Sequence, residues 1–247
     1  MPTTLQEIDE NESAFDTAAF VKQALAGRRA LASVIDHTLL KPEATRDQVR
    51  KLCTEAAEYR FACAMVNPAW VATAYSALAG SGVPVGAVVG FPLGASLTTT
   101  KREEAVALLR LGARELDMVL NIGLLKSGEN AQVQNDIRGV AQVAHDGGAI
   151  LKVILETSLL NLEEKLRACE LACAAGADFL KTSTGFSTGG ATAADVALLR
   201  GVAGGRCGVK ASGGIRTLED ARAMLEAGAN RIGASASVAI VEALDAA

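Results

Sequence analysis

The sequence predicts a single closed (β/α)8 barrel, the TIM-barrel class, preceded by one extra N-terminal helix. Eight short apolar runs alternate with longer amphipathic segments, which is the pattern of parallel strands joined by helices. The length of 247 residues suits eight such units closed into a barrel. No G-x-G-x-x-G sequence follows the first run, and its absence counts against an open dinucleotide-binding sheet.

The predicted strands are short runs of apolar residues, many of them β-branched. They cover Ala32–Asp36, Phe61–Val66, Val85–Val89, Glu115–Leu120, Leu151–Glu156, Asp178–Thr182, Gly208–Ala211 and Arg231–Ala234. Several of the helices between them have a recognisable start, a Thr or Asn that precedes an acceptor side chain by three residues. These predicted helix starts are Thr45, Asn161, Thr192 and Thr217.

The segment ahead of the first strand is predicted to be a tail followed by the extra helix. Apolar residues recur at helical spacing from Ala14 to Ala26, and Gly27 is a suitable helix terminator. We therefore expect two parts, a tail and extra helix over residues 1–30 and the (β/α)8 barrel over residues 31–247.

Composition excludes several classes of protein. Apolar residues make up 50% of the chain, which is enough for a large core, and the 24 glycines suit many tight turns. A net charge of −4 with scattered basic residues argues against a nucleic-acid partner. The five cysteines lack C-x-x-C spacing, so neither a disulfide framework nor a zinc site is indicated. The polar N-terminus and the lack of a long apolar stretch predict a cytoplasmic protein with no membrane partner.

Two lysines are the first candidates for chemistry. Lys181 stands where the sixth predicted strand becomes a loop of small residues. Desolvation and a nearby cation would lower its pKa and make the neutral amine available as a nucleophile. Strand alternation places Lys210 on the neighbouring strand, facing the same way. At about 6 Å the two ammonium groups would repel by about 3 kcal/mol, which would keep Lys181 partly neutral near pH 7. Two ordinary lysines with solvated ends are the alternative.

Two aspartates are candidates for proton transfer beside these amines. Asp117 is flanked by apolar residues near the end of the fourth predicted strand, and Asp36 ends the first. A carboxylate at the same end of a neighbouring strand would complete a proton relay. For each, a hydrogen-bonded structural carboxylate is the alternative.

Glycine-rich turns follow the sixth, seventh and eighth predicted strands. Backbone N–H groups in such turns bind anions, and barrels commonly bind phosphate in the loops after strands seven and eight. Tight turns that bind nothing are the alternative. The candidate phosphate-binding residues are Gly185, Gly213, Gly214, Arg216, Gly233 and Ser235.

Metal chemistry is disfavoured by the supply of ligands. The chain has two histidines, and His37 and His145 are predicted to lie away from the lysines. A catalytic zinc site usually needs several histidine ligands. We therefore expect no metal and no cofactor. Lys152, near the start of the fifth predicted strand, is expected to form a buried ion pair inside the barrel.

The motifs resemble those of the deoxyribose-phosphate aldolases from Ile35 onward. The matching stretches are Ile35–Leu40, Val66–Pro68, Val88–Gly94, Glu115–Gly123, Leu151–Thr157, Phe179–Gly185, Val209–Arg216 and Arg231–Ser235. Members of this family are class I aldolases on a (β/α)8 barrel. They reversibly join acetaldehyde to glyceraldehyde 3-phosphate, giving 2-deoxyribose 5-phosphate.

The resemblance implies a role for each candidate residue. It makes Lys181 the amine that forms the Schiff base, Lys210 the group that perturbs its pKa, and Asp117 the proton carrier, with Asp36 in the same site. It also implies that the six turn residues named above bind the substrate phosphate. Phosphosugar and aldehyde substrates are then the expected partners.

Three features differ from the pattern of some family members. Phe186 stands where some have a lysine that helps to bind phosphate, and Ala236 stands where some have a second serine. The C-terminal segment from Glu242 carries no tyrosine. These differences bear on phosphate binding and on closure of the site.

Other functions and the oligomeric state stay open from the residues alone. Another phosphosugar aldolase or isomerase would keep the same barrel and phosphate loops. A non-catalytic sugar-phosphate-binding protein would not need two lysines at strand ends. Helices rich in Ala and Leu, such as Ala105–Leu111, suit either a homodimer or homotetramer contact or packing on the barrel.

Overall fold

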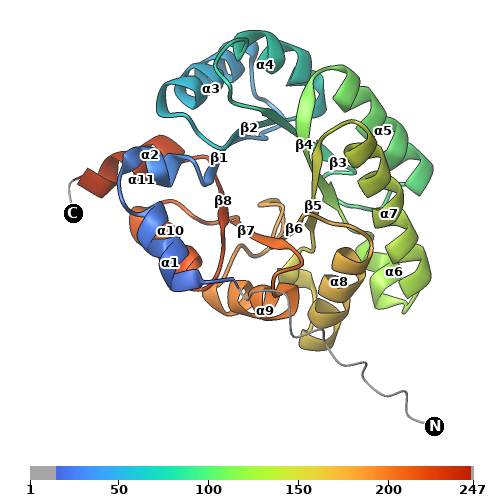
Figure 1. The fold of residues 1–247 in the computed structure, drawn as a ribbon. Coiled ribbons are helices and arrows are strands. Elements are labelled where there is room, and N and C mark those ends of the chain that lie inside the picture. The colour runs from blue at the N-terminus through green and yellow to red at the C-terminus, as the bar shows by residue number, and fades with distance from the viewer. Residues whose placement is uncertain (1–14, 246–247) are drawn as a thin grey trace.

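The structure, a computed structural model, describes residues 15–245 and confirms the predicted closed barrel. Its strands are β1 (Ile35–Leu39), β2 (Cys63–Val66), β3 (Val85–Val89), β4 (Ala113–Val119), β5 (Ile150–Ile154), β6 (Phe179–Lys181), β7 (Gly208–Ser212) and β8 (Arg231–Ala234). They pair in sequence order, all parallel, and β8 closes on β1. Figure 1 looks down this barrel and shows the helices as a ring outside the strands.

After two N-terminal helices, each strand is followed by at least one helix, as expected of the fold. The helices are α1 (Thr17–Ala24), α2 (Arg28–Ala32), α3 (Arg46–Tyr59), α4 (Val71–Ala77), α5 (Thr98–Arg110), α6 (Ile122–Lys126), α7 (Asn130–Asp146), α8 (Leu162–Ala174), α9 (Ala193–Ala203), α10 (Leu218–Glu226) and α11 (Ser237–Glu242). Short 3-10 helices are η1 (Pro68–Trp70), η2 (Thr157–Leu159) and η3 (Ala243–Asp245). The four predicted helix starts are confirmed, because each of these side chains accepts a hydrogen bond from the backbone N–H three residues on.

The region ahead of the barrel differs from its prediction. The structure has two short helices there, α1 against α10 and α2 beside α11 (Figure 1), where one helix over residues 14–26 was expected. The boundary proposed between residues 30 and 31 falls within α2, and the division of the chain stays a prediction. Residues 1–14 of the predicted tail and extra helix lie outside the described residues.

The first strand was predicted three residues too early. Arg28–Ala32 is helical and β1 begins at Ile35, so the strand predicted from Ala32 to Asp36 is wrong. A short continuous apolar run fits a helix or a strand equally, and Ala and Leu favour the helix. Asp36 is therefore the second residue of its strand and not the last.

Strand alternation divides the core into two environments. In β4, Leu116 and Met118 join the apolar layer between strands and helices, whereas Glu115 and Asp117 make ion pairs with residues of other strands. Such barrels are usually filled inside by layers of branched apolar side chains. This barrel instead carries a layer of charged groups across its middle.

The strand register determines which side chains meet in that layer. Lys181 pairs with Lys210 between β6 and β7, and Lys210 pairs with Arg231 between β7 and β8. Asp117 pairs with Lys152 between β4 and β5. Among the described helices, none combines the length and the apolar character required to cross a bilayer.

Candidate active site

Seven ionisable side chains form one buried network inside the barrel. Three are acids and four are bases: Asp36, Glu115, Asp117, Lys152, Lys181, Lys210 and Arg231. They come from β1, β4, β5, β6, β7 and β8, and ion pairs connect all of them. Buried charges are tolerated when they are paired in this way.

Asp117 joins the two candidate lysines. Its Oδ2 accepts a hydrogen bond from the Nζ of Lys181 at 2.7 Å and another from the Nζ of Lys210 at 2.7 Å. Its Oδ1 accepts from the Nζ of Lys152 at 2.8 Å. The structure therefore brings together the three residues that the sequence selected, with one carboxylate oxygen in contact with both amines.

Asp36 lies one step further from Lys181. Its Oδ2 accepts from the Nζ of Lys210, and its Oδ1 accepts from the Nε of Arg231. Arg231 also donates to both carboxylate oxygens of Glu115. Asp36 is thus placed to orient Lys210, and in the described structure it forms no ion pair with Lys181 itself.

Lys152 forms buried ion pairs inside the barrel, as the sequence predicted. Its Nζ lies 2.6 Å from an oxygen of Glu115 and 2.8 Å from one of Asp117, and its side chain is fully buried. Burial by itself would lower the pKa of Lys152, but the charges of Asp117 and Glu115 raise it well above its usual value. Lys152 is therefore a permanent cation, unsuited to nucleophilic attack.

The pKa of Lys181 is shifted toward neutrality. Burial lowers its pKa to about 8, the charge of Asp117 opposes that change, and the charge of Lys210 adds to it. The predicted repulsion by Lys210 contributes, but desolvation is the larger cause. An amine with this pKa is about a tenth neutral at pH 7 and half neutral at about pH 8, and its neutral form can act as a nucleophile.

The charge count gives an independent reason for a neutral Lys181. When every group is ionised the network holds three negative and four positive charges, and when Lys181 is neutral the charges balance. Burial alone would raise the pKa of Asp117, but Lys152 and then Lys181 and Lys210 hold it well below its usual range. Asp117 therefore stays ionised beside Lys181, and the lowered pKa of Lys181 makes it the group expected to lose a proton.

A cavity of about 430 Å³ opens beside Lys181. Its wall is formed by the segments that follow β1, β6, β7 and β8. All six predicted phosphate-binding residues line it: Gly185, Gly213, Gly214, Arg216, Gly233 and Ser235. The structure thus places Lys181 and the glycine-rich turns in one cavity.

Hydrogen bonds between β6 and β7 hold two of these turns together. The hydroxyl of Thr182 donates to the carbonyl of Ser212 and accepts from its N–H, both at 3.1 Å. The hydroxyl of Ser212 donates to the carbonyl of Ser183 at 2.7 Å. Gly185 and Gly213 have φ of 83° and 88°, a conformation that glycine adopts without strain.

Comparison with known proteins identifies the family. A sequence model of the DeoC/LacD family aldolases matches residues 30–242. The chain belongs to this family. Resemblance to deoxyribose-phosphate aldolases, expected from the motifs, is confirmed by relatives that carry that name.

These relatives match most of the DeoC/LacD aldolase chain. It is 58% identical over 211 residues to the deoxyribose-phosphate aldolases of Bacillus mycoides (strain KBAB4) and Bacillus cytotoxicus, covering 85% of this chain and 94% of each relative. Among solved structures, the deoxyribose phosphate aldolase of Aeropyrum pernix, described as a unique tetramer, is 37% identical. It matches with a TM-score of 0.86 over 93% of this chain and 97% of that one.

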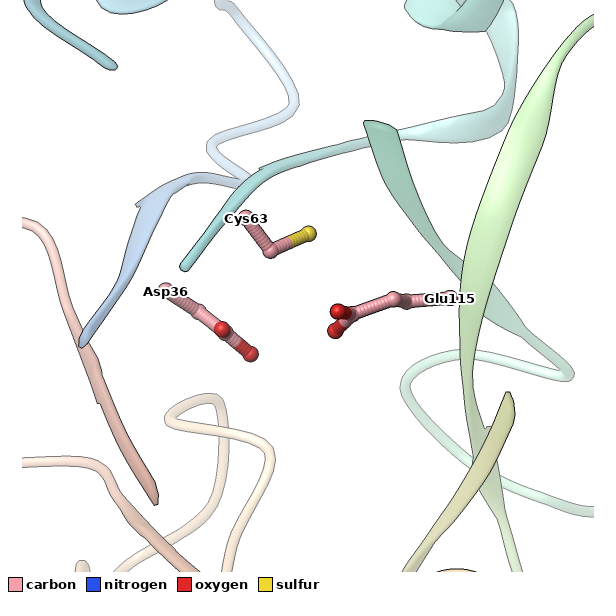
Figure 2. A group of neighbouring side chains, drawn as sticks. All are labelled: Asp36, Cys63 and Glu115. Carbon is pink, nitrogen blue, oxygen red and sulfur yellow. The ribbon is translucent and has the colours of Figure 1, made fainter. Parts of the chain in front are cut away.

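One cluster in this aldolase has side chains that can bind metals. Asp36, Cys63 and Glu115 point toward one another (Figure 2), and their ligand atoms lie within 4.8 Å of one another. Both carboxylates already bind Arg231 and Lys152. Burial, then the charges of Glu115 and Asp36, raise the pKa of the Cys63 thiol well above its usual value. The cluster is therefore part of the ion-pair network, with a thiol that stays protonated.

Sequence reasoning missed two members of the aldolase's network. Glu115 and Arg231 begin predicted strands and were not selected, although each stands two residues before a selected position, Asp117 or Gly233, and so shares its face. That spacing was the available signal. The two histidines lie elsewhere, since His37 contacts Glu55 on α3 and His145 contacts Asp178, each at 2.9 Å.

Proposed function

We propose that this chain cleaves 2-deoxy-D-ribose 5-phosphate reversibly to D-glyceraldehyde 3-phosphate and acetaldehyde, with Lys181 as the amine that forms the Schiff base. The observation that carries the assignment is the buried amine of Lys181, which donates to Asp117 at 2.7 Å and lines one cavity with the glycine-rich turns. The relatives at 58% identity carry the name of this activity. That agreement disfavours both a different phosphosugar enzyme and a non-catalytic binding protein.

The reaction begins with attack by the neutral amine of Lys181 on the aldehyde carbon C1 of the open-chain sugar. The carbinolamine that forms loses water to give an iminium ion. Because Oδ2 of Asp117 contacts the amines of Lys181 and Lys210 at 2.7 Å each, we assign Asp117 and Lys210 the proton transfers at this stage. Asp36 orients Lys210 through its hydrogen bond.

The iminium ion then acts as an electron sink. A two-carbon aldehyde and a three-carbon phosphate can form only if the bond between C2 and C3 breaks. The electrons of that bond pass into the enamine as the C3 hydroxyl loses its proton, and glyceraldehyde 3-phosphate departs. Protonation of the enamine at C2 and hydrolysis of the resulting iminium release acetaldehyde and restore the free amine.

The glycine-rich turns bind the other end of the substrate in this proposal. Gly185, Gly213 and Gly214 have positive φ, and turns of this kind can direct N–H groups at an anion. Arg216 lines the same cavity, and its backbone N–H and that of Thr217 donate to the Asp220 carboxylate at the start of α10. The phosphate would anchor the sugar while C1 meets Lys181.

Reductive trapping tests the assignment of the nucleophile. Sodium borohydride added during turnover of deoxyribose 5-phosphate should attach a reduced adduct to Lys181, identified by peptide mass spectrometry. Lys181→Ala should lose activity by about four orders of magnitude, since nucleophilic catalysis is removed. A turning-over enzyme that remains unmodified at Lys181 would refute the scheme.

Lys152→Met is the informative companion variant. Lys152 is also buried beside Asp117, so this variant separates loss of the nucleophile from loss of a buried cation. It should still form the trapped adduct at Lys181, although more slowly.

The assembly and location of the enzyme are further parts of the proposal. We propose a homodimer or homotetramer, supported by the Aeropyrum pernix relative, whose structure is described as tetrameric. We also propose that the enzyme works in the cytoplasm. Light scattering of the purified chain would test the first, and fractionation of cells producing it would test the second.

A further inference from the structure

Glu156 is a buried carboxylate that the mechanism above leaves without a role. It follows β5, is 2% exposed, and has a left-handed backbone with φ 55° and ψ 62°. The N–H of Leu155 donates to the carbonyl of Lys181 at 2.9 Å. The N–H of Thr157 donates to the carbonyl of Thr182 at 3.0 Å. The backbone on both sides of Glu156 is therefore bonded to the end of β6 and to the residue after it, and the backbone conformation of Glu156 is one that residues other than glycine rarely adopt.

One oxygen of Glu156 holds the loop that follows β6. Its Oε2 accepts hydrogen bonds from the N–H of Thr184, at 3.2 Å, and from the Thr184 hydroxyl. The same hydroxyl oxygen accepts from the N–H of Phe186 at 3.0 Å. These bonds lie on either side of Gly185, whose φ is 83°. The carboxylate thus fixes both ends of the Gly185 turn.

The other oxygen of Glu156 carries a cost in stability. Oε1 is buried and has no hydrogen-bond partner within residues 15–245. An unpaired buried carboxylate oxygen destabilises the folded state. Such costs are usual where a residue serves function and not packing.

The loop held by Glu156 forms part of the cavity wall. Thr184, Gly185 and Phe186 line it, as do Lys181 and the Gly213 turn. We propose that Glu156 is a positioning residue that sets the Gly185 turn to bind the substrate phosphate. This inference rests on the proposed function, and it assigns Glu156 to phosphate recognition and not to the chemistry at Lys181.

Assays with a phosphorylated and an unphosphorylated substrate distinguish a role in phosphate recognition from a role in the chemistry at Lys181. The full-length enzyme and Glu156→Ala are assayed with deoxyribose 5-phosphate and with unphosphorylated deoxyribose. Loss of a charge-assisted hydrogen bond that shapes the turn should raise KM for the phosphorylated substrate about tenfold. Its kcat, and kcat/KM for deoxyribose, should change by less than about twofold, because uniform binding and not transition-state stabilisation is removed.

Glu156→Gln and an exposed glutamate supply the controls. The glutamine carbonyl can still accept from Thr184, so KM for the phosphorylated substrate should rise by about threefold, less than in the alanine variant. Glu163→Ala removes a glutamate from the first turn of α8, 81% exposed, and should match wild type. Circular dichroism establishes that each variant is folded. If Glu156→Ala does not fold, the KM of Glu156→Gln for the phosphorylated substrate, compared with that of wild type, tests the inference.

Either of two results would overturn the inference. Equal losses on both substrates would place Glu156 in the chemistry or in general stability, and unchanged KM for the phosphorylated substrate would remove its role. Titration of inorganic phosphate by calorimetry keeps the test independent of activity. If the wild-type enzyme does not cleave deoxyribose 5-phosphate, the proposed function fails. The ratio of phosphate Kd between wild type and Glu156→Gln then still tests Glu156.

Discussion

At the residue scale, the reactivity of Lys181 depends on its neighbours. A buried lysine with a carboxylate at 2.7 Å would ordinarily be a stable ammonium. Here the carboxylate of Asp117 is shared with Lys152 and Lys210, so its charge is already compensated. Desolvation then outweighs the remaining attraction and the pKa falls to about 8. The same lysine beside an unshared aspartate would be an unreactive cation.

Lys210→Met tests this dependence. The charge of Lys210 lowers the pKa of Lys181, and Lys210 also compensates Asp117, so its removal raises the pKa of Lys181 for both reasons. The acidic limb of the plot of kcat/KM against pH should move from near pH 8 upward by on the order of one unit. The rate at pH 7 should fall by at least about tenfold.

Lys126→Met is the control for this prediction. Lys126 lies on α6, and its ion pair with Glu164 is outside the network. The control should keep the wild-type profile. A Lys210→Met enzyme that is slower but has an unmoved acidic limb would show that Lys210 serves only as an acid.

At the scale of helices and strands, the parts set by local sequence were predictable. Thr45 and Asn161 start helices because the side-chain oxygen of each accepts a hydrogen bond from the backbone N–H three residues later. That local contact is sufficient to cap a helix. The first strand was misplaced because its apolar run has no such local marker, and packing decides between helix and strand. Glu156 was predicted to be the last residue of a strand, but β5 ends at Ile154.

The segment between β6 and α9 packs against the turn after β7 in a way that local sequence does not reveal. The N–H of Ala191 donates to the carbonyl of Gly213 at 2.9 Å. A Cβ at Gly190 would lie 2.3 Å from that carbonyl oxygen. The absence of a side chain at Gly190 therefore allows this segment to pack against the turn after β7.

Gly190→Ala should displace the Gly213 turn. Because the contact is with backbone, the turn or the segment must move, which we expect to cost about 1–3 kcal/mol of stability. KM for deoxyribose 5-phosphate should rise by about tenfold while kcat/KM for deoxyribose stays near wild type. Gly201→Ala in α9 is the control, since nothing lies within 4 Å of its added Cβ. Wild-type KM in Gly190→Ala would mean that the turn does not bind phosphate.

At the scale of the whole molecule, the charged layer is a property of barrel closure. Arg231 reaches Asp36 across a separation of 195 residues and Glu115 across 116. Those contacts exist only when β8 pairs with β1 and all strands hold their register. The sequence identifies Lys181, Lys210 and Asp117 as a group, but the ion pairs that compensate their charges follow from the complete barrel.

The depressed pKa of Lys181 should appear in the stability of the whole protein. The pKa of Lys181 is about 8 in the folded protein, and its ordinary value of 10.5 applies to the unfolded chain. Between pH 8 and pH 10.5 the unfolded chain therefore holds a proton that the folded chain lacks. Stability from this group therefore rises with pH from about 8 to about 10.5, by about 3 kcal/mol in total, and the full penalty applies below pH 8.

Lys181→Met removes this titration. Urea unfolding of both proteins at pH 7, 8, 9 and 10 should show the variant gaining most, relative to wild type, at pH 7, with the difference shrinking as pH rises toward 10.5. Comparing each variant with wild type at the same pH cancels the other groups that titrate in this range. Lys181→Ala should show the same slope with a constant offset, because it also lacks the amine but leaves a cavity. If the difference does not vary with pH, folding does not neutralise Lys181. The amine of Lys181 would then lose its proton only after the substrate binds.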